Sequence, residues 1–238
     1  MAQIYKYDSY QRSYETRISN ICVVKHKTAI ACEDNIFYPK GGGQPCDTGY
    51  IKISETTLKV EKTIKMDGNV WLFLDRLFDL DVGQEVFCML DWEKRYSNMR
   101  CHTAAHVVMS SIKRNIRDFS SDSIEIQNNF EVDLVFKGIW DNSIDKANKI
   151  LNLSNNLIRQ NLSVYQEDFN DVESALNKYS KIYRGSTAPS FNGLFRLVVI
   201  KDWDANPCAG THLRELSEIG CIELLDFSSN KFKIRVNS

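Results

Sequence analysis

The sequence predicts an α+β protein in which a small β-barrel-like domain is followed by an α+β domain. Residues 1–90 contain short β-rich segments separated by turn signals, and the pattern changes to helical spacing near Asp91. Beyond Asp91, helical and strand-like segments alternate, which is typical of an α+β arrangement. The chain has 238 residues, enough for one large or two modest domains at about 150 residues each. We therefore expect a β domain over residues 1–92 and an α+β domain over residues 93–238.

The N-terminal domain is expected to consist of short, closely spaced strands. Strand-forming runs occur at residues 21–24, 28–31 and 70–74, and turn signals occur at Asp34-Asn35 and Asp67-Gly68-Asn69. Short strands at such spacing predict a small barrel or a curled sheet.

The C-terminal domain is expected to contain three helices and several strands. The first helix runs from near Asp91 to about Arg117, and the second from Asn142 or Ser143 to about Gln160, with Ser143 as its cap. The buried stripe of the second helix is predicted to contain Ile144, Ala147, Ile150, Leu151, Leu157 and Ile158. A shorter third helix is expected to include Val172, Ala175, Leu176 and Tyr179. Strands are expected at residues 124–126, 131–136, 194–200, 221–225 and 232–236.

Composition and charge exclude several classes of protein. The net charge of -1 excludes a protein that coats nucleic acid through bulk positive charge, so an RNA partner would be recognised by a local patch or a shaped pocket, and DNA is not expected. The first residues lack the apolar core of a signal peptide, and no apolar run approaches the ~20 residues of a membrane span. The seven irregularly spaced cysteines are typical of reduced thiols. We expect a cytoplasmic protein without a membrane partner.

Two short motifs contain three of the four histidines in the chain. In the first, His102 and His106 are four residues apart on a predicted helix, so both imidazoles lie on one face. In the second, Cys208 and His212 have the same spacing. Three imidazoles and one thiolate are nitrogen and sulfur ligands of the kind that zinc prefers. The sequence therefore predicts that His102, His106, Cys208 and His212 bind one zinc ion.

The first motif lacks the carboxylate of a metallopeptidase. Zinc peptidases of the H-E-x-x-H type carry a Glu as general base next to the first His, where this chain has Thr103. The inverted type would need a Glu where Ala105 stands. A metal site without such a base favours a more labile bond than a peptide, such as an ester.

A third motif is the glycine-rich segment Tyr38-Pro39-Lys40-Gly41-Gly42-Gly43-Gln44-Pro45. Consecutive glycines allow the backbone to approach another molecule closely. The Gln44 amide can both donate and accept a hydrogen bond. The segment is not a phosphate-binding P-loop, because no Gly-Lys-Ser/Thr follows.

Together these motifs resemble the editing domain of alanyl-tRNA synthetase and its free-standing relatives, the AlaX trans-editing proteins. The resemblance covers nearly the whole chain, and the presence of the glycine motif together with the position of the second box matches the medium form of AlaX. It departs at Ala209, where glycine is frequent, and at Lys40, where an acidic residue is common. It rests on the order of the three motifs and on their neighbours, namely Tyr38-Pro39, Asp47-Thr48-Gly49, Asp91-Trp92, Arg95 and Glu218-Ile219-Gly220.

The resemblance implies a zinc-dependent aminoacyl-tRNA hydrolase that acts in trans on mischarged tRNA(Ala). Its substrate would be Ser-tRNA(Ala) and, in some members, Gly-tRNA(Ala), because a pocket built for alanine cannot strongly reject serine or glycine by binding alone. The sequence does not distinguish serine from glycine and does not predict the oligomeric state.

The resemblance also implies roles for residues beside the zinc ligands. Thr103 and Gln44 are expected at the catalytic site, where Thr103 would bind the serine hydroxyl or, alternatively, a backbone carbonyl of its own helix. Gly42, Gly43, Gln44, Thr103 and Arg95 are expected to bind substrate. RNA phosphates are expected to contact some of the basic residues Lys94, Arg95, Arg100, Lys113, Arg114 and Arg117 on the first helix, and Lys231, Lys233 and Arg235 on the last strand.

The chemistry allows two versions at the zinc. In one, zinc activates water for attack on the ester carbonyl. In the other, zinc positions the aminoacyl group and a free ribose hydroxyl orients the water, a version favoured by the missing carboxylate. Two functions of other classes also fit the motifs: a non-catalytic RNA-binding module with a structural zinc, and a zinc hydrolase of a small ester or peptide, against which the missing Glu counts.

Overall fold

The computed structural model describes residues 2–183 and 194–237. The chain divides into two compact units, an N-terminal unit (Met1–Ser97) and a C-terminal unit (Asn98–Ser238). The division falls inside helix α1 (Trp92–Asn115), which contributes its first turns to one unit and the remainder to the other. The predicted division into functional domains after residue 92 stays a prediction.

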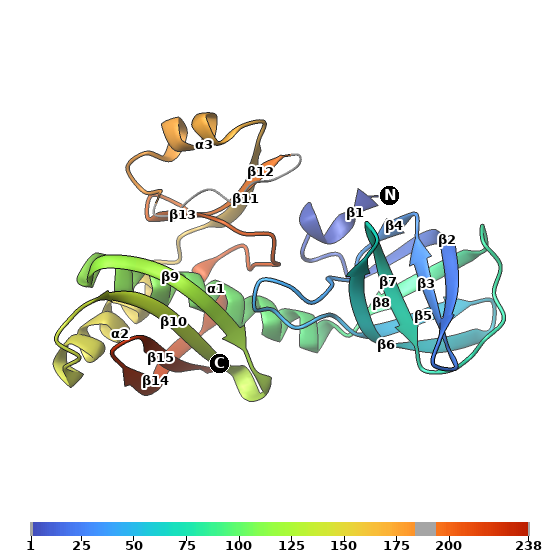
Figure 1. Cartoon of the computed structure of the whole chain (residues 1–238), viewed down its shortest axis with the longest axis horizontal. Coiled ribbons are helices and arrows are strands. Elements are labelled where there is room, and N and C mark those ends of the chain that lie inside the picture. The colour runs from blue at the N-terminus through green and yellow to red at the C-terminus, as the bar shows by residue number, and fades with distance from the viewer. Residues whose placement is uncertain (1, 184–193, 238) are drawn as a thin grey trace. The chain divides into compact units, whose positions relative to one another are not determined.

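The N-terminal unit contains a closed barrel of six strands in the order β2-β3-β7-β6-β5-β8 (Figure 1). All six neighbouring pairs are antiparallel. The predicted fold class, with a small N-terminal barrel, is therefore confirmed. The barrel strands are β2 (Ser13–Val24), β3 (Lys27–Cys32), β5 (Gly49–Ile53), β6 (Thr56–Met66), β7 (Asn69–Leu74) and β8 (Glu85–Leu90).

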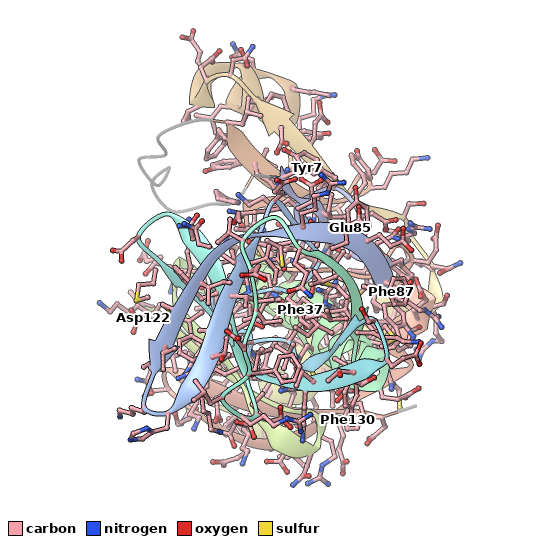
Figure 2. All side chains as sticks on the ribbon, turned by 90° about the vertical axis from the view of Figure 1, so that its right-hand side faces the viewer. Tyr7, Phe37, Glu85, Phe87, Asp122 and Phe130 are labelled. Carbon is pink, nitrogen blue, oxygen red and sulfur yellow. The ribbon has the colours of Figure 1, made fainter. Side chains whose placement is uncertain are left out.

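The barrel forms because apolar side chains alternate along its strands. In β5, Ile51 and Ile53 are buried whereas Tyr50 and Lys52 are exposed, as a strand with one face toward the core requires. Phe37 is fully buried and lies inside the ring of barrel strands (Figure 2).

The predicted turn at Asp34-Asn35 is only partly right. These two residues form the short strand β4 (Asp34–Asn35), which pairs in parallel with β1 (Ala2–Gln3), ahead of the short 3-10 helix η1 (Ile4–Lys6). The Asp34 carboxylate accepts a hydrogen bond from the backbone nitrogen of Ala2 at 3.1 Å, and this bond holds the pair together.

The C-terminal unit contains two antiparallel sheets, with strand orders β14-β15-β10-β9 and β11-β12-β13 (Figure 1). The predicted strands are present, but β11 and β13 were not expected from the sequence. The strands are β9 (Arg117–Ile126), β10 (Glu131–Ile139), β11 (Val164–Phe169), β12 (Phe195–Ile200), β13 (Asp204–Pro207), β14 (Cys221–Ser228) and β15 (Lys231–Asn237), and the short 3-10 helices are η2 (Asn128–Phe130) and η3 (Leu216–Ile219).

Helices α2 (Ile144–Arg159) and α3 (Val172–Tyr179) confirm the two later helices that the sequence predicts. The Ser143 side chain caps α2 by accepting a hydrogen bond from the backbone nitrogen of Lys146. Ile144 was predicted to be buried but is 54% exposed, because the first residue after the cap lies beyond the end of the buried stripe. Helix α2 packs against β14, and α3 packs against β11 and β12.

Helix α1 is enclosed on every side between residues 101 and 112, all of which are buried. The sequence predicts a helix here with an apolar stripe, but the structure surrounds the polar positions as well. A helix buried all round places its histidines away from water, and this environment controls their chemistry. Among the described residues, no helix is long and apolar enough to cross a membrane.

Candidate metal centre

The C-terminal unit brings the two histidine motifs together. Helix α1 presents His102 and His106 one turn apart, and the loop after β13 presents Cys208 and His212. The four candidate ligand atoms all lie within 4.8 Å of one another. The ring centroids of His102 and His212 are 4.4 Å apart, and those of His106 and His212 are 4.7 Å apart. These four residues could hold one metal ion.

Two sulfur–nitrogen distances within the group match those of a tetrahedral metal site. With metal–nitrogen and metal–sulfur bonds of about 2.0 and 2.3 Å, neighbouring ligand atoms of a tetrahedral zinc lie about 3.3 to 3.7 Å apart. The Sγ atom of Cys208 is 3.6 Å from Nε2 of His102 and 3.3 Å from Nε2 of His212. The donor atoms of Cys208, His102 and His212 therefore have the spacing of a tetrahedral site, and the full set of four atoms lies within 4.8 Å.

Burial keeps the three imidazoles neutral. It lowers the pKa of His102 to about 3, with a smaller contribution from His106. It lowers the pKa of His106 to about 4, helped by the positive charge of Lys113, and it holds the pKa of His212 well below its ordinary value. A neutral imidazole is the form that binds a metal.

Burial shifts the pKa of the Cys208 thiol upward, whereas it shifts the pKa of the imidazoles downward. Burial raises the pKa of Cys208 to about 11, although backbone N–H groups of Gly210 and Ala209 oppose the shift. A coordinated cation deprotonates a thiol outright. The group is thus a set of neutral nitrogen and sulfur donors that could bind a cation.

Thr103 lies directly behind one of the candidate ligands. Its Oγ1 accepts a hydrogen bond from the backbone nitrogen of Leu213 at 3.1 Å and lies 3.3 Å from Nδ1 of His212. When Nε2 of His212 faces the ion, Nδ1 carries the proton and donates it to Thr103, which fixes the orientation of the ring. The sequence offers no signal for this contact, because the partners are more than 100 residues apart.

The loop that carries Cys208 and His212 is held from the small sheet as well. The side-chain amide of Gln166 in β11 donates a hydrogen bond to the Gly210 carbonyl at 3.2 Å. On the same sheet, Arg196 donates through Nε and Nη2 to the two carboxylate oxygens of Asp168, each at 2.6 Å. The Gln166 contact holds the backbone between the two ligands, and the Arg196–Asp168 pair joins the strands β11 and β12.

The glycine-rich segment lies in the N-terminal unit. Gly41 and Gln44 bond to each other through their backbones and close a tight turn, and Gly42 and Gly43 have φ values of 56° and 78°. Residues other than glycine rarely adopt two such values in succession, so the conformation itself requires these glycines. Gln44 is fully buried. The roles of Gly42, Gly43 and Gln44 toward a substrate stay predictions.

Arg95, which the sequence predicts to bind substrate, has several partners inside the N-terminal unit. Its side chain is fully buried and ion-paired with Asp47, and its Nη1 donates to the Ser9 carbonyl at 2.9 Å and its Nη2 to the Ile36 carbonyl at 2.6 Å. Asp47 also accepts from the backbone nitrogen of Tyr38 at 2.6 Å, at the base of the glycine-rich segment. Arg95 therefore supports that segment from the interior, and its predicted contact with a substrate stays a prediction.

Several basic residues predicted to contact RNA are used within the C-terminal unit. Arg100 donates to the carbonyls of Ile219 and Asn237, at 2.7 and 2.8 Å. The three basic residues of β15 pair with acidic residues of β10, in the ion pairs Lys231–Asp133, Lys233–Glu131 and Arg235–Glu131. Their charge is largely neutralised where they stand, which makes β15 a poorer phosphate-binding surface than its sequence suggests.

Comparison with known proteins gives matches at both ends of the chain. Residues 10–94 match the family described as tRNA synthetases class II (A), and residues 195–237 match the threonyl and alanyl tRNA synthetase second additional domain. Each match covers less than half of the chain. The chain is therefore similar to parts of class II and of threonyl and alanyl tRNA synthetases at these two stretches.

Individual relatives are more specific. The chain is 30% identical over 227 residues to alanine–tRNA ligase of Sulfurisphaera tokodaii, which covers 94% of this chain and 24% of the ligase. It is 29% identical over 239 residues to the alanyl-tRNA editing protein AlaX-L of Pyrococcus horikoshii, covering 98% of this chain and 56% of AlaX-L. The chain thus spans about a quarter of the ligase and about half of the editing protein. The resemblance to AlaX-type alanyl-tRNA editing proteins, predicted from the three motifs, is confirmed.

Proposed function

We propose that this chain is a zinc-dependent deacylase that edits mischarged tRNA(Ala) in trans in the cytoplasm. It would hydrolyse the ester of Ser-tRNA(Ala), and we propose Gly-tRNA(Ala) as a further substrate. Water would add to the ester carbonyl, the bond from the carbonyl carbon to the ribose oxygen would break, and the ribose oxygen would take the proton. Similarity to AlaX-L over 98% of the chain supports this substrate.

The observation that carries the proposal is the convergence of four donors from two distant motifs, three of them buried and the Cys208 thiol half-buried. His102, His106, Cys208 and His212 would hold one zinc ion. Bound zinc supplies a Lewis acid that can polarise a carbonyl or orient an aminoacyl group. The neutral state of the three imidazoles, described above, supports their role as ligands.

Thr103 is the residue best placed to act on the aminoacyl group. It accepts hydrogen bonds from Leu213 and, with zinc bound, from His212, so its own hydroxyl proton is left to donate. We propose that this proton is donated to the hydroxyl of an esterified serine, an interaction that alanine cannot make. For Gln44, a role toward the substrate is proposed only from its place in the glycine-rich motif.

A second candidate is a non-catalytic RNA-binding module with a structural zinc. The observation that favours it is the number of protein ligands, because four ligands close a tetrahedral site whereas catalytic zinc sites keep one position open. Under this alternative, loss of Cys208 would unfold the C-terminal unit and no ester would be cleaved.

One assay separates the two candidates. Zinc-loaded protein is incubated with Ser-, Gly- and Ala-charged tRNA(Ala), and release of each amino acid is compared with that in buffer. We expect rapid loss of serine and little loss of alanine, and the rate for glycine shows whether it is also a substrate. Ser-tRNA(Ala) as stable as in buffer, together with a Cys208→Ala variant that no longer melts cooperatively, would instead establish the structural zinc.

Thr103→Val sharpens the assay, because valine keeps the shape of threonine and removes the hydroxyl. We expect it to reduce the preference for serine over alanine by about 10-fold, in line with the loss of one hydrogen bond of about 1.5 kcal/mol. An unchanged preference would contradict the role of Thr103 in serine selection.

A further inference from the structure

The segment from Trp203 to Leu213 runs along helix α1 and carries two of the candidate ligands. At one end, Trp203 and Asn206 contact the later turns of α1, and at the other end the backbone nitrogen of Leu213 donates to Thr103. The ligand-bearing stretch from Cys208 to His212 lies between these two anchoring points. The segment is thus fixed on both sides of the metal centre.

At Trp203, the ring, the indole N–H and the backbone carbonyl each contact a residue of helix α1. The guanidinium carbon of Arg114 lies 3.7 Å from the centre of the Trp203 ring, which is a close cation–π contact. Arg114 also donates to the Trp203 carbonyl and, at 3.2 Å, to the Ser110 carbonyl. We call Ser110, Arg114 and Trp203 the Trp203 clamp.

Ser110 closes the clamp onto the helix. The indole nitrogen of Trp203 donates to Oγ of Ser110 at 2.8 Å, and that hydroxyl donates in turn to the Val107 carbonyl at 2.8 Å. Val107 follows directly after the ligand His106 in α1. The clamp therefore connects the position of Trp203 to the turn of the helix that carries His106.

A parallel contact lies closer to the ligands. The ammonium group of Lys113 donates to the side-chain carbonyl of Asn206 at 3.2 Å, two residues before Cys208. Asn206 also donates to the carboxylate of Asp204 within the same strand, β13. Lys113 and Arg114, which the sequence suggests as phosphate contacts, are both engaged with the segment that leads to Cys208.

We propose that the Trp203 clamp is a positioning device for the metal centre, which holds Cys208 against His102 and His106 in advance of metal binding. The inference rests on the proposed zinc site. A segment that is already ordered loses less conformational freedom when it binds the ion, so the clamp strengthens metal binding without touching the metal. Partners behind metal ligands typically change metal affinity by about 10- to 100-fold when removed.

The test is a measurement of metal affinity in clamp variants of the full chain. Zinc dissociation constants are obtained by competition with a chromophoric chelator, and Co²⁺ loading is followed by the visible absorption of a tetrahedral cobalt–thiolate centre. We expect Trp203→Ala and Arg114→Ala to weaken zinc binding about 10- to 100-fold and to shift or broaden the cobalt bands. Trp203→Phe and Arg114→Lys, which keep a ring or a cation, are expected to recover most of the affinity.

Trp140→Ala provides a matched control in the same unit. Trp140 also donates its indole N–H, in this case to the backbone carbonyl of Ser229 at 2.8 Å, but it packs in an aromatic group with Phe136, Phe227 and Phe232. We expect Trp140→Ala to lower the melting temperature while leaving zinc affinity and the cobalt spectrum unchanged.

Two results would overturn the proposal. Clamp variants that bind zinc as tightly as the wild type, with the same cobalt spectrum, would show that the clamp only stabilises the fold. An equal loss of affinity in Trp140→Ala would show the same. Wild-type protein that takes up neither metal is a different result, because it would remove the proposed metal centre and the role of the clamp with it. If Trp203→Ala does not fold, the zinc affinities of Trp203→Phe and Arg114→Gln are compared instead. The proposal requires weaker zinc binding in Arg114→Gln than in Trp203→Phe.

Discussion

Two buried polar groups in this molecule look alike in burial and differ in composition. In the N-terminal unit, Arg95 is enclosed with Asp47, an opposite charge that accepts from the guanidinium. In the C-terminal unit, His102, His106 and His212 are enclosed with the Cys208 thiol, and the group contains donors of electrons but no cation. A buried ion pair contains its own counter-charge, whereas a buried group of neutral nitrogen and sulfur donors can take up a cation.

The largest expected effect on stability comes from breaking the buried ion pair between Arg95 and Asp47. Asp47→Ala would leave the Arg95 guanidinium buried without its counter-charge, which typically costs about 3–5 kcal/mol. We expect the free energy of unfolding, measured in urea, to fall by that amount. Asp79→Ala, an exposed aspartate of the same unit, is the control and should change it little. A small loss with Asp47→Ala would mean that Arg95 finds other partners or water.

The second prediction concerns zinc binding by the histidine–cysteine group of the C-terminal unit. At zinc concentrations about 100-fold above the dissociation constant, linkage stabilises the folded state by about 2.7 kcal/mol. We expect calorimetry to show a higher melting temperature with zinc for the wild type and no such shift for Cys208→Ala. Cys221→Ala replaces an exposed cysteine of the same unit and should keep the full shift. A shift that survives in Cys208→Ala would place the zinc elsewhere.

The third and smallest effect concerns a charge group at the surface. Hydrogen bonds from Lys233 and Arg235 hold the pKa of Glu131 below its ordinary value of 4.5. The unfolded chain then takes up a proton at higher pH than the folded one, so this stabilisation is present above pH 4.5 and is lost as the pH falls through the folded pKa. We expect Glu131→Gln to make the free energy of unfolding less sensitive to acid below pH 4.5.

This effect is measured by urea unfolding on both sides of pH 4.5. Glu125→Gln, an exposed position on neighbouring strand β9, serves as the comparison and should keep the acid sensitivity of the wild type. Equal acid sensitivity of Glu131→Gln and the wild type would show that the β10–β15 ion pairs are fully screened by solvent.

Local patterns account for most of what the sequence predicts correctly. The cap at Ser143, the apolar spacing of α2 and the alternation in β5 are each contained within a few neighbouring residues, and each appears in the structure. Ile144 failed because the pattern does not show where a buried stripe ends. Strand β11 was missed because its sequence, Val-Tyr-Gln-Glu-Asp-Phe, contains three consecutive polar residues.

For the candidate site too, the sequence predicts local features and misses contacts between distant residues. The four ligands could be predicted, because the residue types and the two i, i+4 spacings are visible in the sequence. The contacts of Thr103 with Leu213 and of Ser110 with Trp203 could not, because they join positions 110 and 93 residues apart. The basic residues show the opposite error: Arg95, Arg100 and Arg114 suggest a surface for RNA, but each guanidinium is engaged within the fold.

The separation of the two histidine motifs has a consequence for biosynthesis. Cys208 contacts His102 across 106 positions of the chain, so a ribosome completes helix α1 long before it makes the thiol. Until then the nascent polypeptide offers an incoming ion only two imidazoles on one helical turn. Acquisition of the metal is therefore expected to be a late event, coupled to completion of the last sheet rather than to the first appearance of a ligand.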